Sequence, residues 1–258
     1  MVKLKNYNVV LKHFVLLLTF TVLISCAEKK YRVTKIEGQE IGITDKNGEV
    51  PEIENFIKPY KAKIDSDLNT VLSTAPETID KSGEWQTPMG NFLSDITFER
   101  SNNVFQLKYN KSVDICLLNH GGIRTIIPKG NITARNAYEI MPFENSAVVI
   151  VLKGEQVLEI VNYIISEKKP HPLKGMTFTI DKNNLPINIQ VNGNPIDLNK
   201  IYFVATSDYL SYGNDNMLFF KKGIQKYDLE YKLRNIIIDY FKENKSTVAN
   251  KDVRITKE

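Results

Sequence analysis

The sequence predicts an α+β fold, a single domain with a mixed sheet and packed helices. Strand-like and helix-like segments are mixed along the chain without the strict strand–helix–strand alternation of a doubly wound sheet. Residues 113–118 form a continuous apolar run, which is typical of a strand buried on both faces. Residues 31–258 contain no internal repeat and no low-complexity linker, so we expect one domain there.

In the first part of this domain, the sequence predicts strands followed by two helices. Residues 31–43 alternate in polarity enough to indicate strands, and residues 45–48 carry a turn signal. Pro51 opens a helix whose apolar residues recur at three- and four-residue steps and therefore share one face. A second helix is expected over residues 90–102. The apolar stripe of the first helix consists of Ile53, Phe56, Ile57, Tyr60, Ile64, Leu68, Val71 and Leu72.

Shorter elements follow the buried strand. Thr133 can cap a short helix that Pro142 ends, and Gly154 begins an amphipathic helix. The last long helix is expected over residues 229–241. The expected strands are residues 146–152, a hairpin of residues 176–180 with 187–191, residues 201–206, and an edge pairing at 253–255.

The first 26 residues have the composition of an export signal. Lysines begin the segment, and residues 14–24 form an apolar core that is too short to span a bilayer comfortably. Leu23-Ile24-Ser25-Cys26 then resembles the lipobox of bacterial lipoproteins, whose cysteine is diacylated and becomes the new N-terminus. An ordinary cleaved signal or a short anchor is the alternative. We therefore expect residues 1–26 to be a lipoprotein signal peptide, residues 27–30 a tether and residues 31–258 the domain.

Acylation of Cys26 would attach the protein to a membrane while the folded part stays in water. Glu28 disfavours retention at an inner membrane, so the expected location is the cell envelope, at the outer membrane facing the periplasm or at the cell surface. Cys116 would then be the remaining thiol, and its apolar surroundings indicate a core residue, so no disulfide is expected.

The charge of the chain gives no indication of nucleic-acid binding. The formal net charge is +4, and three lysines of the signal account for most of it, which leaves the mature chain near +1. The sequence also lacks an arginine cluster or a stripe of alternating basic and aromatic residues. We expect no nucleic-acid partner.

Three polar segments interrupt the apolar elements where a ligand can approach. Residues 119–124 (Asn-His-Gly-Gly-Ile-Arg) directly follow the buried strand, and paired glycines can turn backbone N–H groups toward an anion. Arg124 supplies a planar fork suited to phosphate. A simple turn with a solvated arginine is the alternative interpretation. His120 fits two roles equally well, a phosphate donor or a solvent-facing spacer.

The other two segments are residues 141–145 and 206–217. Phe143 is held beside a proline, where it can stack on a planar base, although a core phenylalanine next to a helix end fits the sequence as well. The later segment is rich in Gly, Asn and Asp, and can present several hydrogen-bonding groups to a small ligand, or can be an ordinary surface loop.

Taken in order, these segments resemble the C-terminal domain of the 5'-nucleotidase family. The resemblance extends over roughly residues 60 to 256. The matching segments are residues 90–95 (Gly-Asn-Leu-x-x-Asp in the family), 119–124 (Asn-x-Gly-Gly-Ile-Arg), 141–143 (Leu-Pro-Phe), 208–215 (the Asn-Gly-Gly-Asp-Gly loop) and 253–255 (Gly-Arg-Ile).

The resemblance implies that Asn119 and Arg124 contact the phosphate end of a substrate, and that Phe143 forms one wall of a clamp around the base. The second wall in the family is an aromatic residue just after the glycine-rich loop, where this chain has Met217. The acidic residue that contacts the ribose would fall at Gly223, so the sugar contact has no counterpart here. The substrate-binding residues implied are Asn119, Gly121, Gly122, Arg124, Phe143 and Asp215.

In this family the hydrolytic chemistry belongs to a separate N-terminal metallophosphatase domain that binds two metal ions. Such a site needs several histidines among carboxylates, whereas His13, His120 and His171 are the three histidines of the chain and none has a metal-ligand spacing. We expect no catalytic residue, metal site or cofactor in this chain, and a divalent metal, Mn or Zn, only in a partner metallophosphatase.

The sequence therefore predicts the substrate-binding half of a 5'-nucleotidase-type phosphohydrolase. It would take part in nucleotide hydrolysis and catabolism together with a separate metallophosphatase, with a nucleotide or nucleoside-like small molecule as ligand. The alternative is a non-catalytic ligand-binding or scaffold lipoprotein of the same fold. Hydrolysis by this chain alone is not expected.

Overall fold

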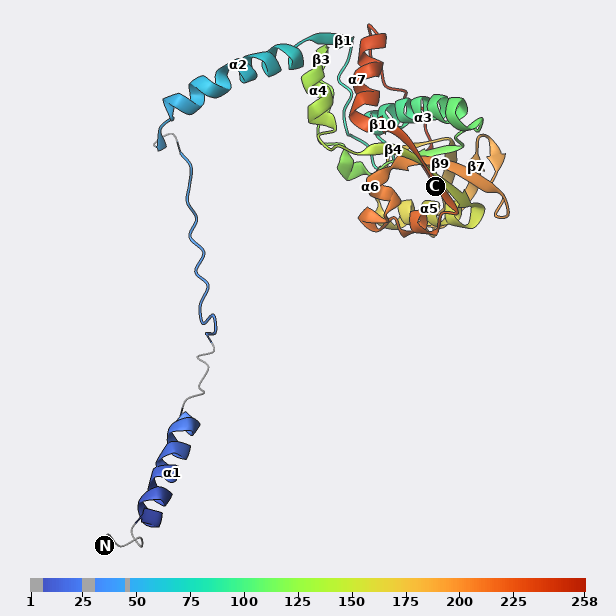
Figure 1. Cartoon of the computed structure of the whole chain (residues 1–258). Coiled ribbons are helices and arrows are strands. Elements are labelled where there is room, and N and C mark those ends of the chain that lie inside the picture. Colours follow the sequence, from blue (N-terminus) through green and yellow to red (C-terminus); the bar gives the residue numbers. More distant parts are fainter. Residues whose placement is uncertain (1–6, 25–30, 45–46) are drawn as a thin grey trace, which may run out of the picture. The chain divides into compact units, whose positions relative to one another are not determined.

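The computed structural model describes residues 7–24, 31–44 and 47–258 (Figure 1). By internal contacts the chain forms two units, residues 1–51 and residues 52–258. The lipobox cysteine, Cys26, lies outside the described residues.

The first unit contains the helix α1 (Tyr7–Ile24), which includes the apolar core of the expected signal. In the described parts of the chain, no helix combines the length and apolar character needed to cross a membrane. Residues 31–44 form no strand, and their apolar side chains, such as Tyr31 and Ile36, are almost fully exposed. The strands expected over residues 31–43 are therefore wrong, because among the described residues no strand lies beside this stretch to satisfy its backbone hydrogen bonds.

The helix α2 (Pro51–Leu68) begins at the expected proline and ends before the expected stripe does. Val71 and Leu72 belong instead to β1 (Val71–Ala75), which pairs antiparallel with β3 (Gly130–Thr133). Val71 and Leu72 thus adopt a strand conformation, because backbone hydrogen bonds to a strand distant in sequence outweigh their helical spacing. No residue of α2 is buried.

A five-stranded mixed sheet forms the centre of the second unit, in the order β10-β4-β9-β2-β5. The strand β2 runs parallel to β9, and the other neighbours are antiparallel. The strands predicted over residues 113–118, 146–152 and 201–206 are confirmed as β2, β4 and β9. The bounds are β10 (Gln225–Lys232), β4 (Ser146–Lys153), β9 (Ile201–Ser207), β2 (Ile115–Leu117) and β5 (Leu173–Lys174).

Helices cover both faces of this sheet (Figure 1). On one face lie α3 (Pro88–Tyr109) and α7 (Leu233–Glu243), and on the other lies α5 (Gly154–Glu167). Because side chains alternate along a strand, Val149 of β4 belongs to the core under α3 and α7, while its neighbour Ile150 belongs to the core over α5. Two apolar cores therefore enclose the sheet, and its mostly antiparallel pairing fits the predicted α+β class.

Two helices differ in length from the prediction. The helix α3 is longer: it begins after Thr87, whose side chain accepts a hydrogen bond from the Gly90 N–H, and ends at Asn110 in the left-handed conformation. The helix α7 begins at Leu233, not at residue 229, because residues 225–232 pair with β4 as the edge strand β10.

The smaller elements agree with the prediction. Thr133 precedes α4 (Ala134–Ile140), and the Thr133 N–H donates to Asn136 Oδ1 at 2.8 Å. The predicted hairpin is present, and the chain end pairs parallel with its first strand. This four-stranded sheet contains β11 (Ile255–Lys257), β6 (Met176–Ile180), β7 (Pro186–Val191) and β8 (Asn194–Pro195) in that order.

Candidate functional site

The topology of the central sheet brings the three polar segments to one edge. Because β2 and β9 are parallel, their carboxyl ends lie at the same side of the sheet. The strand β4 is antiparallel to β9, with Ala147 opposite Ser207, so the start of β4 lies at that side too. The segment after β2, the segment before β4 and the segment after β9 therefore converge, although residues as far apart as 119 and 215 contribute.

A cavity of about 340 Å³ lies where these segments meet. All six residues that the sequence singled out as substrate-binding line this cavity, and two others line it that the sequence interpretation did not select. The eight lining residues are Asn119, Gly121, Gly122, Arg124, Phe143, Asn145, Tyr209 and Asp215.

The turn after β2 is a short 3-10 helix, η2 (His120–Gly122). A Cβ on its last residue, Gly122, would lie 2.7 Å from Asn119 Oδ1, so a larger residue there would displace the Asn119 side chain. The Gly122 N–H donates to the Asn119 carbonyl at 3.1 Å and closes the turn. The glycine thus allows the Asn119 side chain to fold over the turn and reach the cavity.

The cation of the site is Arg124, which is exposed at the cavity. Its backbone N–H donates to the Ile140 carbonyl at 3.0 Å, and one guanidinium N–H donates to the Gly121 carbonyl at 3.3 Å. The guanidinium carbon lies 6.0 Å from the ring centroid of Phe143, within range of a cation–π contact. Across the described residues Arg124 has no carboxylate partner, so its charge is available to an anion.

Asp215 connects the loop after β9 to the turn after β2. One carboxylate oxygen accepts from the Asn119 amide at 2.6 Å, and the other accepts from the Tyr209 hydroxyl at 3.0 Å. The Asp215 carbonyl accepts from the Tyr163 hydroxyl at 2.7 Å. The hydrogen bond to Asp215 raises the pKa of Tyr209, so this hydroxyl remains a donor at neutral pH. The carboxylate therefore orients two cavity side chains.

The loop around Asp215 consists of short helical turns. They are α6 (Asp208–Ser211), η3 (Asn214–Asn216) and η4 (Leu218–Lys222). Asp215 itself has a left-handed backbone, with φ of 54°, a conformation that aspartate tolerates better than most residues. The Asn214 side chain donates to the Tyr209 carbonyl at 2.7 Å and holds the loop together.

The two positions that depart from the family pattern lie away from the cavity. Met217 is completely buried in the core beside α5, so it forms no wall. A Cβ at Gly223 would lie 2.4 Å from Ile150 Cγ2, so this position cannot carry an acidic side chain without rearrangement. The aromatic side chain that lines the cavity together with Phe143 is Tyr209, which is 40% exposed.

Two histidines are in contact at the turn after β2. The His120 backbone N–H donates to His171 Nδ1 at 3.2 Å. Burial and the neighbouring His120 lower the pKa of His171 to about 4, and burial lowers the pKa of His120, so both are neutral at pH 7. The side chain of His120 does not line the cavity.

The described residues do not fit a two-metal centre. In residues 7–24, 31–44 and 47–258, no three histidine, cysteine, aspartate or glutamate side chains lie close enough together to hold a metal ion. The pair His120 and His171 is joined by a backbone hydrogen bond and supplies two imidazoles only.

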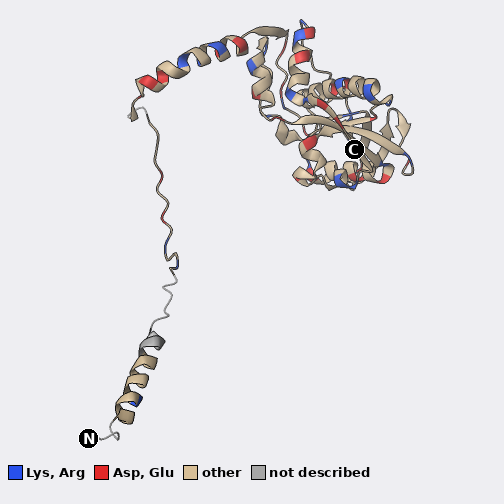
Figure 2. Cartoon of the chain, in the orientation of Figure 1, with Lys and Arg blue, Asp and Glu red and all other residues tan. Residues whose placement is uncertain are grey.

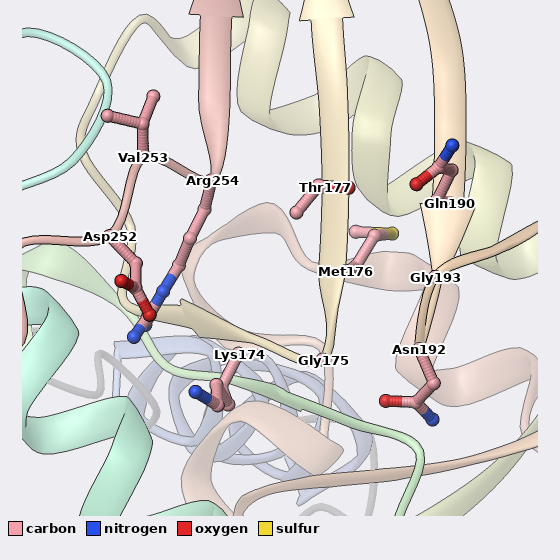
Figure 3. A pocket seen from close by; sticks show the side chains of 10 residues that line it. All are labelled: Lys174, Gly175, Met176, Thr177, Gln190, Asn192, Gly193, Asp252, Val253 and Arg254. Carbon is pink, nitrogen blue, oxygen red and sulfur yellow. The ribbon is translucent and has the colours of Figure 1, made fainter.

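A second cavity, of about 420 Å³, lies between β11, β6 and the turn after β7 (Figure 3). Lys174 and Arg254 line it, but both pair with Asp95, at 3.1 Å and 2.6 Å. Both of its cations thus share a carboxylate partner within the protein, and its lining residues include no aromatic side chain. The cavity at Arg124 is better suited to an anionic, planar ligand.

Two known proteins are similar to this chain over most of its length. The trifunctional nucleotide phosphoesterase protein YfkN of Bacillus subtilis (strain 168) is 26% identical over 229 residues, which are 81% of this chain and 15% of the relative. Protein UshA of Yersinia enterocolitica is 24% identical over 196 residues, 72% of this chain and 34% of the relative. The chain therefore spans about a third or less of the length of these relatives.

Solved structures have the same fold. A 5'-nucleotidase precursor from Thermus thermophilus superimposes with a TM-score of 0.68 at 24% identity, over 79% of this chain and 42% of that chain. The NAD nucleotidase of Haemophilus influenzae superimposes with a TM-score of 0.59 at 18% identity, over 81% and 42%. Residues 69–222 match the family described as 5'-nucleotidase, C-terminal domain. The chain belongs to this family of 5'-nucleotidase C-terminal domains.

Proposed function

We propose that the cavity between Arg124 and Tyr209 binds a nucleotide, and that the chain is the substrate-binding half of a 5'-nucleotidase-type phosphohydrolase. The observation that carries the proposal is the arrangement of an exposed cation, a glycine turn and two aromatic side chains around one cavity of about 340 Å³. A nucleotide has a matching polarity, because an anionic phosphate is joined to a planar base. The names of the related nucleotide phosphoesterases support the same ligand class.

The phosphate end is assigned to Arg124, Asn119 and the turn of Gly121 and Gly122. Arg124 has an exposed guanidinium, and the Asn119 amide is held by Asp215 at the cavity. The absence of side chains on the two glycines lets a phosphate approach the backbone of the turn without steric hindrance. Charge-assisted hydrogen bonds of this kind are about twice as strong as neutral ones.

Arg124→Ala is expected to weaken nucleotide binding by about tenfold to a hundredfold, the loss of about 1.5–3 kcal/mol for a hydrogen bond to a charged group. Titration calorimetry with AMP and with adenosine measures this loss, and adenosine affinity should not change. Lys182→Ala, in the exposed turn before β7, is the control for a change in net charge alone. Equal weakening of AMP and adenosine by Arg124→Ala would contradict the phosphate assignment.

The base end is assigned to Phe143 and Tyr209. Both are about two-fifths exposed, at 44% and 40%, and both line the cavity. Stacking needs an exposed ring face in a fixed place, and Phe143 is fixed by the chain entering β4 while Tyr209 is fixed through its hydroxyl by Asp215. The sequence has Met217 where the family has the second aromatic wall of the base clamp, and Tyr209 fits the role of that second wall.

Phe143→Ala and Tyr209→Ala are each expected to weaken AMP binding by about 1–3 kcal/mol, the usual contribution of a base–aromatic stack. Binding of inorganic phosphate should be unchanged in both variants. Tyr209→Phe keeps the ring and loses only the hydrogen bond to Asp215, so it should bind AMP much better than Tyr209→Ala. Tyr212→Ala, an exposed tyrosine outside the cavity, is the control. If Tyr209→Ala binds AMP as tightly as the wild type, the ring is not a wall.

We further propose that the phosphoryl-transfer step belongs to a separate metallophosphatase. Two-metal hydrolysis requires a cluster of histidine and carboxylate ligands, and the proposal assigns that cluster, with Mn or Zn, to the partner. Phosphate release from AMP should be faster in a mixture of this protein and a candidate metallophosphatase with Mn²⁺ than with the metallophosphatase alone. No acceleration by the mixture would refute the split enzyme and leave nucleotide binding standing.

The second candidate function is a ligand-binding or scaffold lipoprotein without a role in hydrolysis. Two observations favour it: Met217 is buried, and Gly223 has no room for a ribose-binding acid. A thermal-shift screen distinguishes the two, because a ligand at 100 times its dissociation constant stabilises the protein by about 2.7 kcal/mol. No shift with any nucleotide or nucleoside would favour the second candidate.

We also propose that Cys26 is acylated and anchors the protein in the cell envelope, at the outer membrane or the cell surface. The Leu-Ile-Ser-Cys order after an apolar core supports this proposal. Labelling with an alkyne fatty acid should mark the wild-type protein and not Cys26→Ala. Label retained in Cys26→Ala would refute this anchor site.

A further inference from the structure

The helix α2 exposes a row of large apolar side chains. Ile53, Tyr60 and Ile64 are 58%, 61% and 55% exposed, and Ile57 is 38% exposed. Phe56 lies beside the row, at 70% exposed, with its ring 5.7 Å from that of Tyr60. A continuous apolar face of this kind on the surface of a protein indicates a contact surface.

The spacing of these residues matches a helix-pairing seam. Residues 53, 57, 60 and 64 are separated by four, three and four positions, the alternation that places side chains on the narrow stripe of a coiled coil. Pro59 and Lys58 fall on the opposite side of the helix, so the proline ring does not enter the seam. The stripe is therefore suited to packing against one other helix.

Charges flank the seam in an order that selects the partner. Figure 2 shows acidic residues in the first turns of α2, basic residues at its middle and acidic residues again near its end. Glu54 and Lys61 both border the seam, and within the described chain neither forms an ion pair. Two such helices in parallel would align like charges, whereas two in antiparallel orientation bring Glu54 of each copy toward Lys61 of the other.

We propose that α2 pairs antiparallel with α2 of a second copy of this chain. In the pairing that fits best, Ile53 meets Ile64 of the other copy and Ile57 meets Tyr60. The same register brings Glu54 to Lys61, and it brings the ring of Phe56 to the side chain of Lys63, whose ammonium also pairs with Asp67 of its own helix at 2.9 Å. A single register therefore pairs the apolar side chains of the seam and the side chains on both of its sides. The contact uses the same surface of each copy, so it closes as a two-fold dimer.

Two other occupants fit the charges less well. An anionic membrane surface attracts helices with a basic polar face, and α2 carries four acidic residues against three basic ones. A different protein would need its own complementary sequence, whereas α2 is complementary to itself. Membrane burial and a foreign partner are therefore outcomes of the test that would overturn the proposal.

Cysteine cross-linking of the full chain in detergent micelles tests the orientation. Chains carrying Ile53→Cys and chains carrying Ile64→Cys are purified separately, oxidised alone or mixed, and mapped by mass spectrometry. The proposal predicts a link between positions 53 and 64 in the mixture and little link in either variant alone. Like positions of antiparallel copies would lie about 16.5 Å apart along the axis, eleven residues at 1.5 Å each. Links between like positions, or no link at all, would overturn the proposal.

A charge exchange tests the register without large changes in apolar surface. Glu54→Lys should lower the cross-linked fraction severalfold at low salt, because lysine would then face lysine across the seam. Adding Lys61→Glu to the same chain should restore it. Lys58→Glu, on the outer side of α2, is the control and should have little effect. Failure of the second exchange to rescue the first would refute this pairing, whereas AMP binding should stay unchanged in every variant.

Discussion

Arg254→Ala is expected to destabilise the domain by about 3 kcal/mol. The side chain of Arg254 is 5% exposed, and its guanidinium donates to Asp95 Oδ1 at 2.6 Å, to Ser94 Oγ at 2.8 Å and to the Leu173 carbonyl. It thus joins the last strand to α3 and β5. Removing one partner of a buried ion pair typically costs about 3–5 kcal/mol. We expect the lower end of that range because Asp95 is 23% exposed and keeps Lys174 as a partner.

Urea denaturation of the wild type and the variant measures this difference. Lys251→Ala is the matched control, because Lys251 also belongs to an ion pair near the chain end, with Glu77, but both side chains are mostly exposed. Exposed pairs contribute about 0–1 kcal/mol, so this control should be close to neutral. A loss for Arg254→Ala as small as that of the control would show that the buried pair does not hold the last strand in place.

Acid is expected to destabilise the domain through His171. The pKa of this histidine is lowered from 6.5 to about 4 by burial and by His120, so the folded state binds the proton more weakly than the unfolded state. Protonation would place a hydrogen on Nδ1, which accepts from the His120 N–H. The stabilising contribution is complete above pH 6.5 and is lost as the pH falls from 6.5 toward 4. Its full size is about 3 kcal/mol, of which about 2 kcal/mol is lost by about pH 5.

His171→Asn removes this proton-binding group and keeps an acceptor, because the amide oxygen takes the place of Nδ1. The free energy of unfolding of the variant should therefore fall much less between about pH 7 and pH 5 than that of the wild type. His120, whose pKa is also lowered by burial, contributes with the same sign and remains in the variant. Parallel pH profiles for the two proteins would contradict the assignment to His171.

The parts of the fold that the sequence predicted well are those with the strongest apolar patterns. Residues 146–152 and 201–206 are nearly continuous apolar runs, and both became central strands. Residues 225–232 carry charges at alternate positions of an edge strand and lead directly into α7, so their periodicity merged with that of the helix. Pairing with β4, which no local pattern encodes, decides their conformation.

The sequence predicted most of the residues of the site, but it did not predict how they are arranged in space. Asn119, Arg124 and Phe143 stand out in sequence because glycine and proline place polar or aromatic residues at the ends of apolar strands. That they line one cavity with Asp215 follows from the pairing of β9 with β2 and with β4, which is a property of the sheet. Tyr209 was missed because the sequence does not reveal which side of the short helix α6 faces the cavity.

The central claim is that one cavity binds the phosphate of a nucleotide at Arg124 and its base between Phe143 and Tyr209. Calorimetric titration of the full chain with AMP tests it most directly, alongside Arg124→Ala and Phe143→Ala. We predict one saturable site for the wild type, with the affinity for AMP reduced in both variants and the affinity for adenosine reduced only in Phe143→Ala. Absence of AMP binding, or AMP binding that both substitutions leave unchanged, would contradict it.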